Sequence, residues 1–132
     1  MNLIRILMLT CLFSLTAMAE EGDEVRQAIA WLELIDKGDY AASWDQAAPY
    51  FQRAISSMQW QEALSKVREP LGQLVKRELN ESTYHDSLAG APDGDYYVIT
   101  LNTEFVDKQS AVETITVIKV DEQWRAVGYF IK

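Results

Sequence analysis

The distribution of apolar positions divides the chain into two parts. From Glu20 to Leu71, apolar residues recur at intervals of three and four, as expected for amphipathic helices. From Gly72 onward they alternate with polar residues, as expected for strands with one buried face. This order predicts an α+β domain, with three N-terminal helices packed on one face of a curved antiparallel sheet of about four strands.

The first two helical segments have clear ends. Apolar residues at intervals of three and four over residues 25–35 form the first face, and Gly38 is expected to end this helix in the left-handed conformation. The second segment begins near Asp39. Pro49 disfavours helix at the preceding residue, so the chain bends there and another short turn can begin.

The third helix has the most specific start. Ser56 and Gln59 have the spacing of a capping box, in which each side chain bonds the backbone N–H of the other residue. Its apolar face is expected to carry four residues, Trp60, Ala63, Leu64 and Val67. Pro70 and Gly72 then end the helix.

Four strands are expected after Gly72. The first, at residues 73–85, is mostly polar and is expected to be an edge strand or a strongly twisted one, and a loop over residues 86–95 follows it. In the second, which alternates up to Phe105, the odd-numbered positions are expected to face inward. The third and fourth strands, at residues 111–120 and 123–132, are joined by a two-residue turn.

The first nineteen residues follow a different pattern. One positive charge, Arg5, precedes an apolar run at residues 6–15, and Ala17-Met18-Ala19 supplies the small residues that signal peptidase recognises before Glu20. The run is too short to span a bilayer stably. We therefore expect residues 1–19 to be a cleavable signal peptide and residues 20–132 to be one domain. That domain is expected to be periplasmic or secreted, with no membrane anchor.

Composition narrows the functions open to this domain. The single cysteine, Cys11, lies in the signal, so the released domain has no disulfide, thiol nucleophile or thiolate ligand. Lipid attachment at Cys11 is the less favoured alternative, because Thr10 fits poorly as the small residue required before it. Loss of Arg5 changes the formal net charge from −8 to −9, so the domain is acidic. Its negative net charge does not favour binding to nucleic acid or to anionic lipid.

The released domain also contains an ordered set of short motifs. They are Trp31-Leu32, Gly38-Asp39-Tyr40, Ala42-Ser43-Trp44, Trp60 with Pro70-Leu71-Gly72, Gly90-Ala91-Pro92-Asp93-Gly94, Val112-Glu113-Thr114, Trp124-Arg125 and Gly128-Tyr129. This set resembles a known bacterial family, the domain of unknown function numbered 4019. The resemblance implies an exported single domain and brings no established activity or catalytic residue. The layout is also similar to the nuclear transport factor 2-like fold, a likeness that implies no function.

Glu113 is the acidic residue with the most specific functional interpretation. It alternates in phase with Ile115 and Val117, so it faces the core if they do. A carboxylate beneath the helices could bind a ligand or transfer a proton. The opposite face of this strand is nearly as apolar, so a carboxylate at the rim of the sheet, paired with a neighbouring arginine or lysine, is the preferred interpretation.

The pairing of the last two strands decides which side chains lie near Glu113. A two-residue turn at residues 121–122 would place Glu113 opposite Phe130 and Thr114 opposite Tyr129. A slip of one residue would change every facing pair.

Aromatic residues provide the other candidate site. The domain has four tryptophans, at positions 31, 44, 60 and 124, for which core packing is the preferred interpretation. The alternative is an aromatic-lined pocket between the helices and the sheet. On that alternative, the candidate ligand-binding residues are Glu113, Tyr129 and Trp44.

No pattern indicates a catalytic residue or a cofactor. His85 is the only histidine, and with no cysteine in the domain a transition-metal site is not expected. The preferred hypothesis is an exported, non-catalytic binding or interaction module, whose partner is an unknown protein or small molecule. An open sheet edge at residues 73–85 could accept a partner strand.

Two alternatives remain open. One is a small-ligand-binding protein or an enzyme with a pocket between helices and sheet, in which Glu113 is the acid or base and Tyr129 a donor. The other is a structural periplasmic protein with no ligand.

Overall fold

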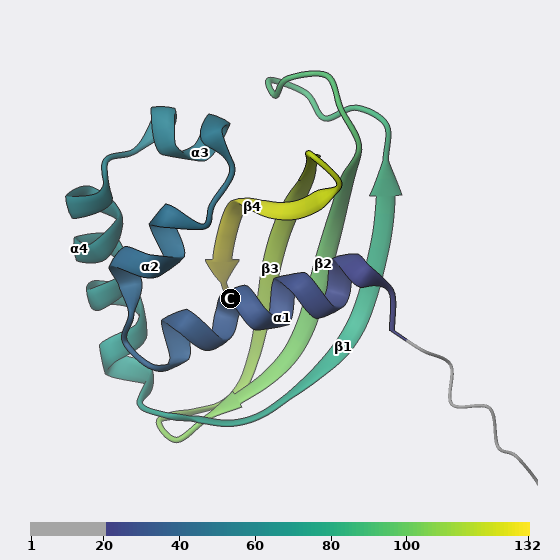
Figure 1. Cartoon of the computed structure of the whole chain (residues 1–132). Coiled ribbons are helices and arrows are strands. Elements are labelled where there is room, and N and C mark those ends of the chain that lie inside the picture. Colours follow the sequence, from purple (N-terminus) through teal and green to yellow (C-terminus); the bar gives the residue numbers. More distant parts are fainter. Residues whose placement is uncertain (1–20) are drawn as a thin grey trace, which may run out of the picture.

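The computed structural model describes residues 21–132, in which four helices precede a four-stranded sheet (Figure 1). The predicted signal peptide, residues 1–19, lies outside the described residues. The helices are α1 (Asp23–Asp36), α2 (Tyr40–Asp45), α3 (Pro49–Ala54) and α4 (Ser57–Arg68), followed by a 3-10 turn, η1 (Glu69–Leu71). The strands are β1 (Leu74–His85), β2 (Tyr96–Phe105), β3 (Lys108–Val120) and β4 (Gln123–Ile131).

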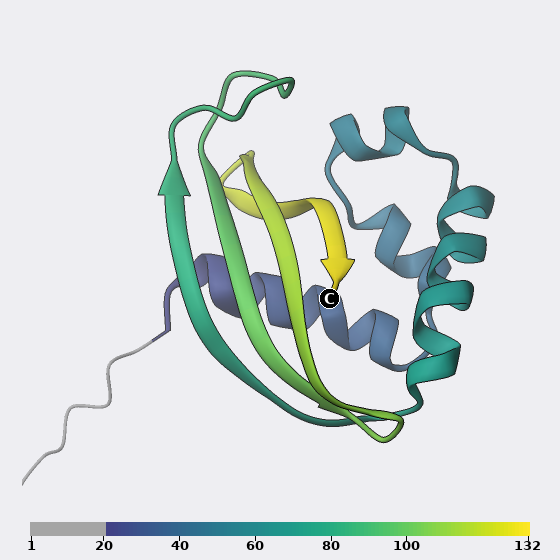
Figure 2. The ribbon, with the colours of Figure 1, turned by 180° about the vertical axis from the view of Figure 1, so that it is seen from behind.

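The expected α+β class is confirmed. The strands are antiparallel in the order β1-β2-β3-β4, so each pairs with its neighbour in the chain, and β1 lies at an edge as predicted. Figures 1 and 2 show α1 across one face of the curved sheet and the other helices grouped beyond β4. Residues 21–132 contain four helices where three were expected, because Pro49, at the first position of α3, starts a separate one. Within residues 21–132, no helix is long and apolar enough to span a membrane.

The main core lies between α1 and the inward face of β2 and β3. The predicted alternation of β2 is confirmed from Ile99 to Phe105, where the odd positions are buried. The apolar face of α1 covers them with five buried residues: Val25, Ala28, Trp31, Leu32 and Ile35. Tyr96 departs from the pattern, because it is fully buried on the other side of β2. There it packs with Ile118 and Ala48 in a second, smaller core.

Helix α4 begins as predicted, but its buried face differs from the predicted one. Ser56 forms the expected capping box with Gln59. Trp60 and Leu64 are buried, but Ala63 is exposed and Val67 is 47% exposed, so the expected four-residue face is wrong at two positions. The buried row instead continues from Leu64 to Arg68 at a spacing of four, which brings a guanidinium into the interior.

Strand β4 contains one residue, Val127, with no partner in β3. This bulge shifts the pairing of the second half of the strand by one position. The predicted facing pairs, Glu113 with Phe130 and Thr114 with Tyr129, are therefore wrong by one residue. Tyr129 turns to the buried face of the sheet, and Phe130, opposite Thr114, turns to the outer face.

Candidate functional site

Glu113 is fully buried on the inward face of β3. Arg77 donates to both of its oxygens, from Nε to Oε1 at 2.7 Å and from Nη2 to Oε2 at 3.2 Å. Thr103 donates to Oε1 at 2.6 Å, and the Tyr129 hydroxyl donates to Oε2. A carboxylate presents about four acceptor positions, so this one is saturated by protein donors. The expected arginine partner is confirmed, but the expected place at the rim of the sheet is wrong.

Arg77 also bonds a second carboxylate, at the end of α1. Its Nη1 and Nη2 donate to Asp36 at 2.8 and 2.9 Å. Arg68, the last residue of α4, donates to the same carboxylate from Nη2 at 2.7 Å. These four residues, Asp36, Arg68, Arg77 and Glu113, are called the buried ion network below. The network has no formal net charge and ties the ends of two helices to the sheet.

The pKa values of Asp36, in the network, and of Tyr129, beside it, are shifted from their ordinary values. Burial by itself would raise the pKa of Asp36, but the hydrogen bonds from Arg77 and Arg68 outweigh it and lower that pKa below its ordinary value of 3.8. Burial and the adjacent Glu113 carboxylate raise the pKa of Tyr129 well above 10.0. At neutral pH, Asp36 is therefore charged and Tyr129 is a neutral donor.

Arg68 is the member of the network that has donor atoms without a partner among the described residues. Its side chain is 5% exposed, and its Nε and Nη1 atoms have no acceptor within the described part of the chain. The guanidinium lies over the Phe105 ring, 4.9 Å from the centroid, so a cation–π contact offsets part of this loss.

The structure brings together two of the three predicted ligand-binding residues, Glu113 and Tyr129. Trp44 lies elsewhere in the fold, on α2, and donates from Nε1 to the Ile55 carbonyl at 2.8 Å. Ligand binding by these three residues stays a prediction, and the saturated carboxylate gives it no support. Sequence reasoning missed Asp36, Arg68 and Arg77. Only Arg68 carried a usable signal, its spacing of four from Leu64.

Two of the four tryptophans, Trp31 and Trp60, are core residues, as expected. Their rings stack with centroids 6.2 Å apart, and both indole N–H groups bond Ser43, one its carbonyl and one its hydroxyl. Trp44 and Trp124 are only partly buried. Core packing, the preferred interpretation, therefore describes Trp31 and Trp60.

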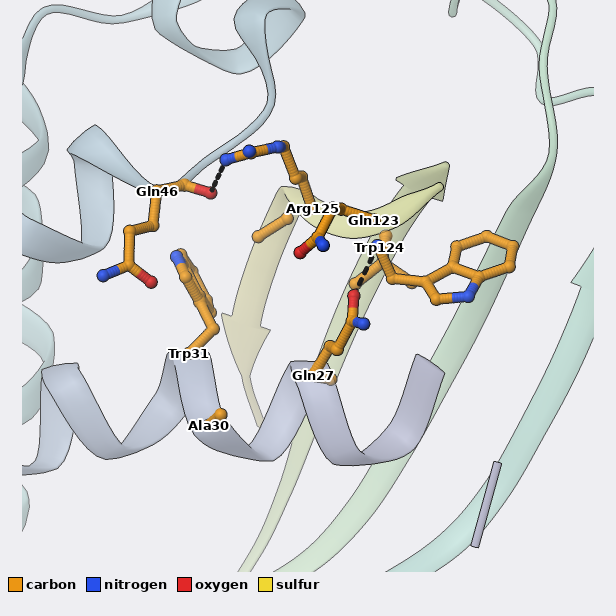
Figure 3. Close-up of a pocket in the computed structure, with 10 residues that line it drawn as sticks. Gln27, Ala30, Trp31, Gln46, Gln123, Trp124 and Arg125 are labelled. Carbon is orange, nitrogen blue, oxygen red and sulfur yellow. Dashed lines mark hydrogen bonds between the residues drawn. The ribbon is translucent and has the colours of Figure 1, made fainter. Parts of the chain in front are cut away.

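An open pocket lies between α1 and β4, at the side of this core (Figure 3). Its volume is about 230 Å³. Small side chains in its wall leave this space, and amides and one guanidinium surround it. The lining residues are Gln27, Ala28, Ala30, Trp31, Gln46, Val117, Gln123, Trp124, Arg125 and Ala126.

The polar groups of this pocket come from three elements. Arg125 Nη1 donates to the Gln46 carbonyl at the end of α2, at 3.4 Å. Gln27 Oε1 accepts the backbone N–H of Trp124, which joins α1 to β4. Figure 3 shows the Trp124 indole pointing away from Trp31 and Gln46, so Trp31 is the aromatic residue on this side.

A second hollow, of about 210 Å³, lies between α4 and β4 and is almost entirely apolar. Its lining residues are Trp60, Ala63, Leu64, Val67, Tyr129, Phe130 and Ile131. Within residues 21–132, no group of three or more histidine, cysteine, aspartate or glutamate residues could hold a metal ion.

The outer edge of β1, expected to accept a partner strand, is irregular. Its pairing with β2 shifts between Leu74 and Lys76, and again between Leu79 and Glu81. Glu78, on the stretch between these shifts, is exposed and charged. Bulges and charges of this kind disfavour the addition of another strand. Partner binding at this edge stays a prediction without support from the geometry.

Comparison with known families identifies a matching family model. The model of a family described as protein of unknown function (DUF4019) matches residues 27–129. The chain belongs to this family. The DUF4019 match runs from α1 to Tyr129, so it spans both the buried ion network and the α1/β4 pocket. A search of curated proteins finds no match.

Proposed function

We propose that this chain is an exported, non-catalytic domain that binds a small molecule in the pocket between α1 and β4. The observation that carries the proposal is the contrast between two groups of polar side chains. The acceptor positions of Glu113 are filled by Arg77, Thr103 and Tyr129. In the α1/β4 pocket, by contrast, the side-chain amides of Gln46 and Gln123 form no hydrogen bond within residues 21–132, and Arg125 has a single acceptor. Catalysis by Glu113 gains no support, because the carboxylate has no acceptor position left for a substrate.

Export is supported by the N-terminal pattern described above. Cleavage before Glu20 would leave every described element intact, since α1 begins at Asp23. The test is expression of the full chain in a Gram-negative host, followed by fractionation and N-terminal sequencing. We expect a periplasmic product that begins at Glu20. Intact chain in the cytosol would contradict the export proposal.

Binding is tested with ¹⁵N-labelled domain and the small-molecule fraction of a periplasmic extract. We expect amide shifts concentrated at residues 27–31 of α1 and at residues 123–126. Ala30→Leu places a larger side chain at an exposed α1 position that lines the pocket, and should abolish the shifts. Ala63→Leu, at an exposed position in the α4/β4 hollow, is the matched control and should leave them unchanged. The reverse result, or no shifts with the unmodified domain, would overturn the proposal.

A further inference from the structure

Arg125 is the single charged residue among the ten that line the α1/β4 pocket. An arginine side chain has five N–H donors. Within residues 21–132, the guanidinium has one acceptor, the Gln46 carbonyl at 3.4 Å, and forms no ion pair. Arg68 and Arg77, in contrast, are both paired with carboxylates. Arg125 therefore presents an uncompensated positive charge to the pocket of an acidic protein.

Three glutamines, Gln27, Gln46 and Gln123, lie around the same space. The Gln27 oxygen is used by the backbone of β4, and its NH₂ group remains. The amides of Gln46 and Gln123 form no hydrogen bond with the described residues. Amide groups both donate and accept, so they suit a ligand with hydroxyl or amide groups. A lipid chain, which has no hydrogen-bonding groups, would make no hydrogen bond with these side chains.

The size of the pocket limits the ligand further. Its volume of about 230 Å³ lies below the roughly 300 Å³ at which pockets begin to take drug-sized ligands. We therefore expect an occupant about the size of a single sugar. We propose that the pocket binds a sugar-sized organic acid, with its carboxylate on Arg125 and its hydroxyl groups on the glutamines. This inference rests on the proposed function and adds the chemical class of the ligand.

The test compares two probes that differ in one group, glucuronate and glucose. Each is titrated to high millimolar concentration into the ¹⁵N-labelled domain. We expect saturable shifts at residues 123–126 with glucuronate and none with glucose. Equal shifts with both probes would overturn the role of the carboxylate and leave the proposed pocket standing. No shifts with either probe would overturn this inference, while the extract experiment decides the proposed function independently.

Arg125→Gln keeps a hydrogen-bonding side chain, although a shorter one, and removes the charge. We expect it to weaken glucuronate binding by roughly tenfold to a hundredfold, as for loss of a charged hydrogen bond. Arg53→Gln, an exposed arginine on α3 outside the pocket, is the matched control and should leave the affinity unchanged. Equal effects of the two substitutions would show a general charge effect and overturn the assignment to Arg125.

Discussion

At the scale of single residues, Glu113 is a buried carboxylate whose hydrogen-bond donors are Arg77, Thr103 and Tyr129. Removing one member of a buried ion pair leaves an uncompensated charge, whereas the intact pair adds little net stability. We therefore interpret the buried ion network as a fixed structural connection between the helix ends and the sheet.

We predict that Glu113→Gln lowers the free energy of unfolding by about 3 kcal/mol, because Arg77, Thr103 and Tyr129 lose a charged acceptor. Urea denaturation measures the change. The matched control is Glu78→Gln on the exposed edge strand, which should change stability by less than about 0.5 kcal/mol. Similar values for both variants would contradict a structural role for Glu113.

The lowered pKa of Asp36 predicts that the free energy of unfolding falls at acidic pH. Its pKa is lowered in the folded state, so its contribution is present above the ordinary value of 3.8 and is lost as the pH falls through the lower folded value. We expect Asp36→Asn to be less stable at neutral pH and to lose less stability between neutral pH and pH 3 than the unmodified domain. Thermal unfolding across this range is the measurement. Asp23→Asn, at an exposed position, should lose as much stability over this pH range as the unmodified domain does.

At the scale of single residues, only part of the site could be predicted from the sequence. The alternation that places Glu113 with Ile115 and Val117 is correct, since all three are buried. Arg77 could not be recognised, because it lies in a polar strand beside Lys76. Its burial depends on facing Thr103 in the neighbouring strand. Such pairing joins residues far apart in the chain, and local periodicity does not contain it.

At the scale of elements, periodicity predicts the helices and strands well, whereas their pairing depends on single irregular residues. The capping box of α4 and the turn at Pro49 have local chemical causes, and both are found. The bulge at Val127 has no such local signal. It nevertheless decides that Tyr129 faces Glu113.

The join between η1 and β1 is predicted to tolerate only glycine. Gly72 has φ of 73° and ψ of −165°, a region essentially restricted to glycine, and an added Cβ would lie 2.9 Å from an Asp107 oxygen. We expect Gly72→Ala to cost about 2–3 kcal/mol of stability. Gly38→Ala, with φ of 79° and open space around the added atom, should cost about 1 kcal/mol. Chemical denaturation of both variants tests the order, and equal costs would contradict it.

At the scale of the whole molecule, net charge opposes the compact state. The formal net charge is −8, and the described exposed ion pairs join Arg26 to Asp23, Lys76 to Glu78 and Lys119 to Glu122. Exposed pairs contribute little, and salt screens buried pairs only weakly. We therefore expect sodium chloride to raise the melting temperature by a few degrees, because it screens repulsion among the surface carboxylates. A fall in melting temperature, measured by differential scanning calorimetry, would show that favourable surface pairs dominate.

The fold class was predictable at this scale because it depends on the change of period near Gly72 and not on any single contact. The likeness to the nuclear transport factor 2-like fold stays a prediction. A pocket between helices and sheet was an alternative interpretation of the sequence, but its place between α1 and β4 was not predicted. Small residues on a helix and a distant strand reveal a hollow only once the two elements lie together.

Strand β4 lies at one edge of the sheet, and it supplies both Tyr129 and Arg125. A truncated copy that stops before it would expose the edge of β3 and leave Glu113 short of a donor. Loss of this one strand would therefore remove a donor of the buried carboxylate and a wall of the α1/β4 pocket together.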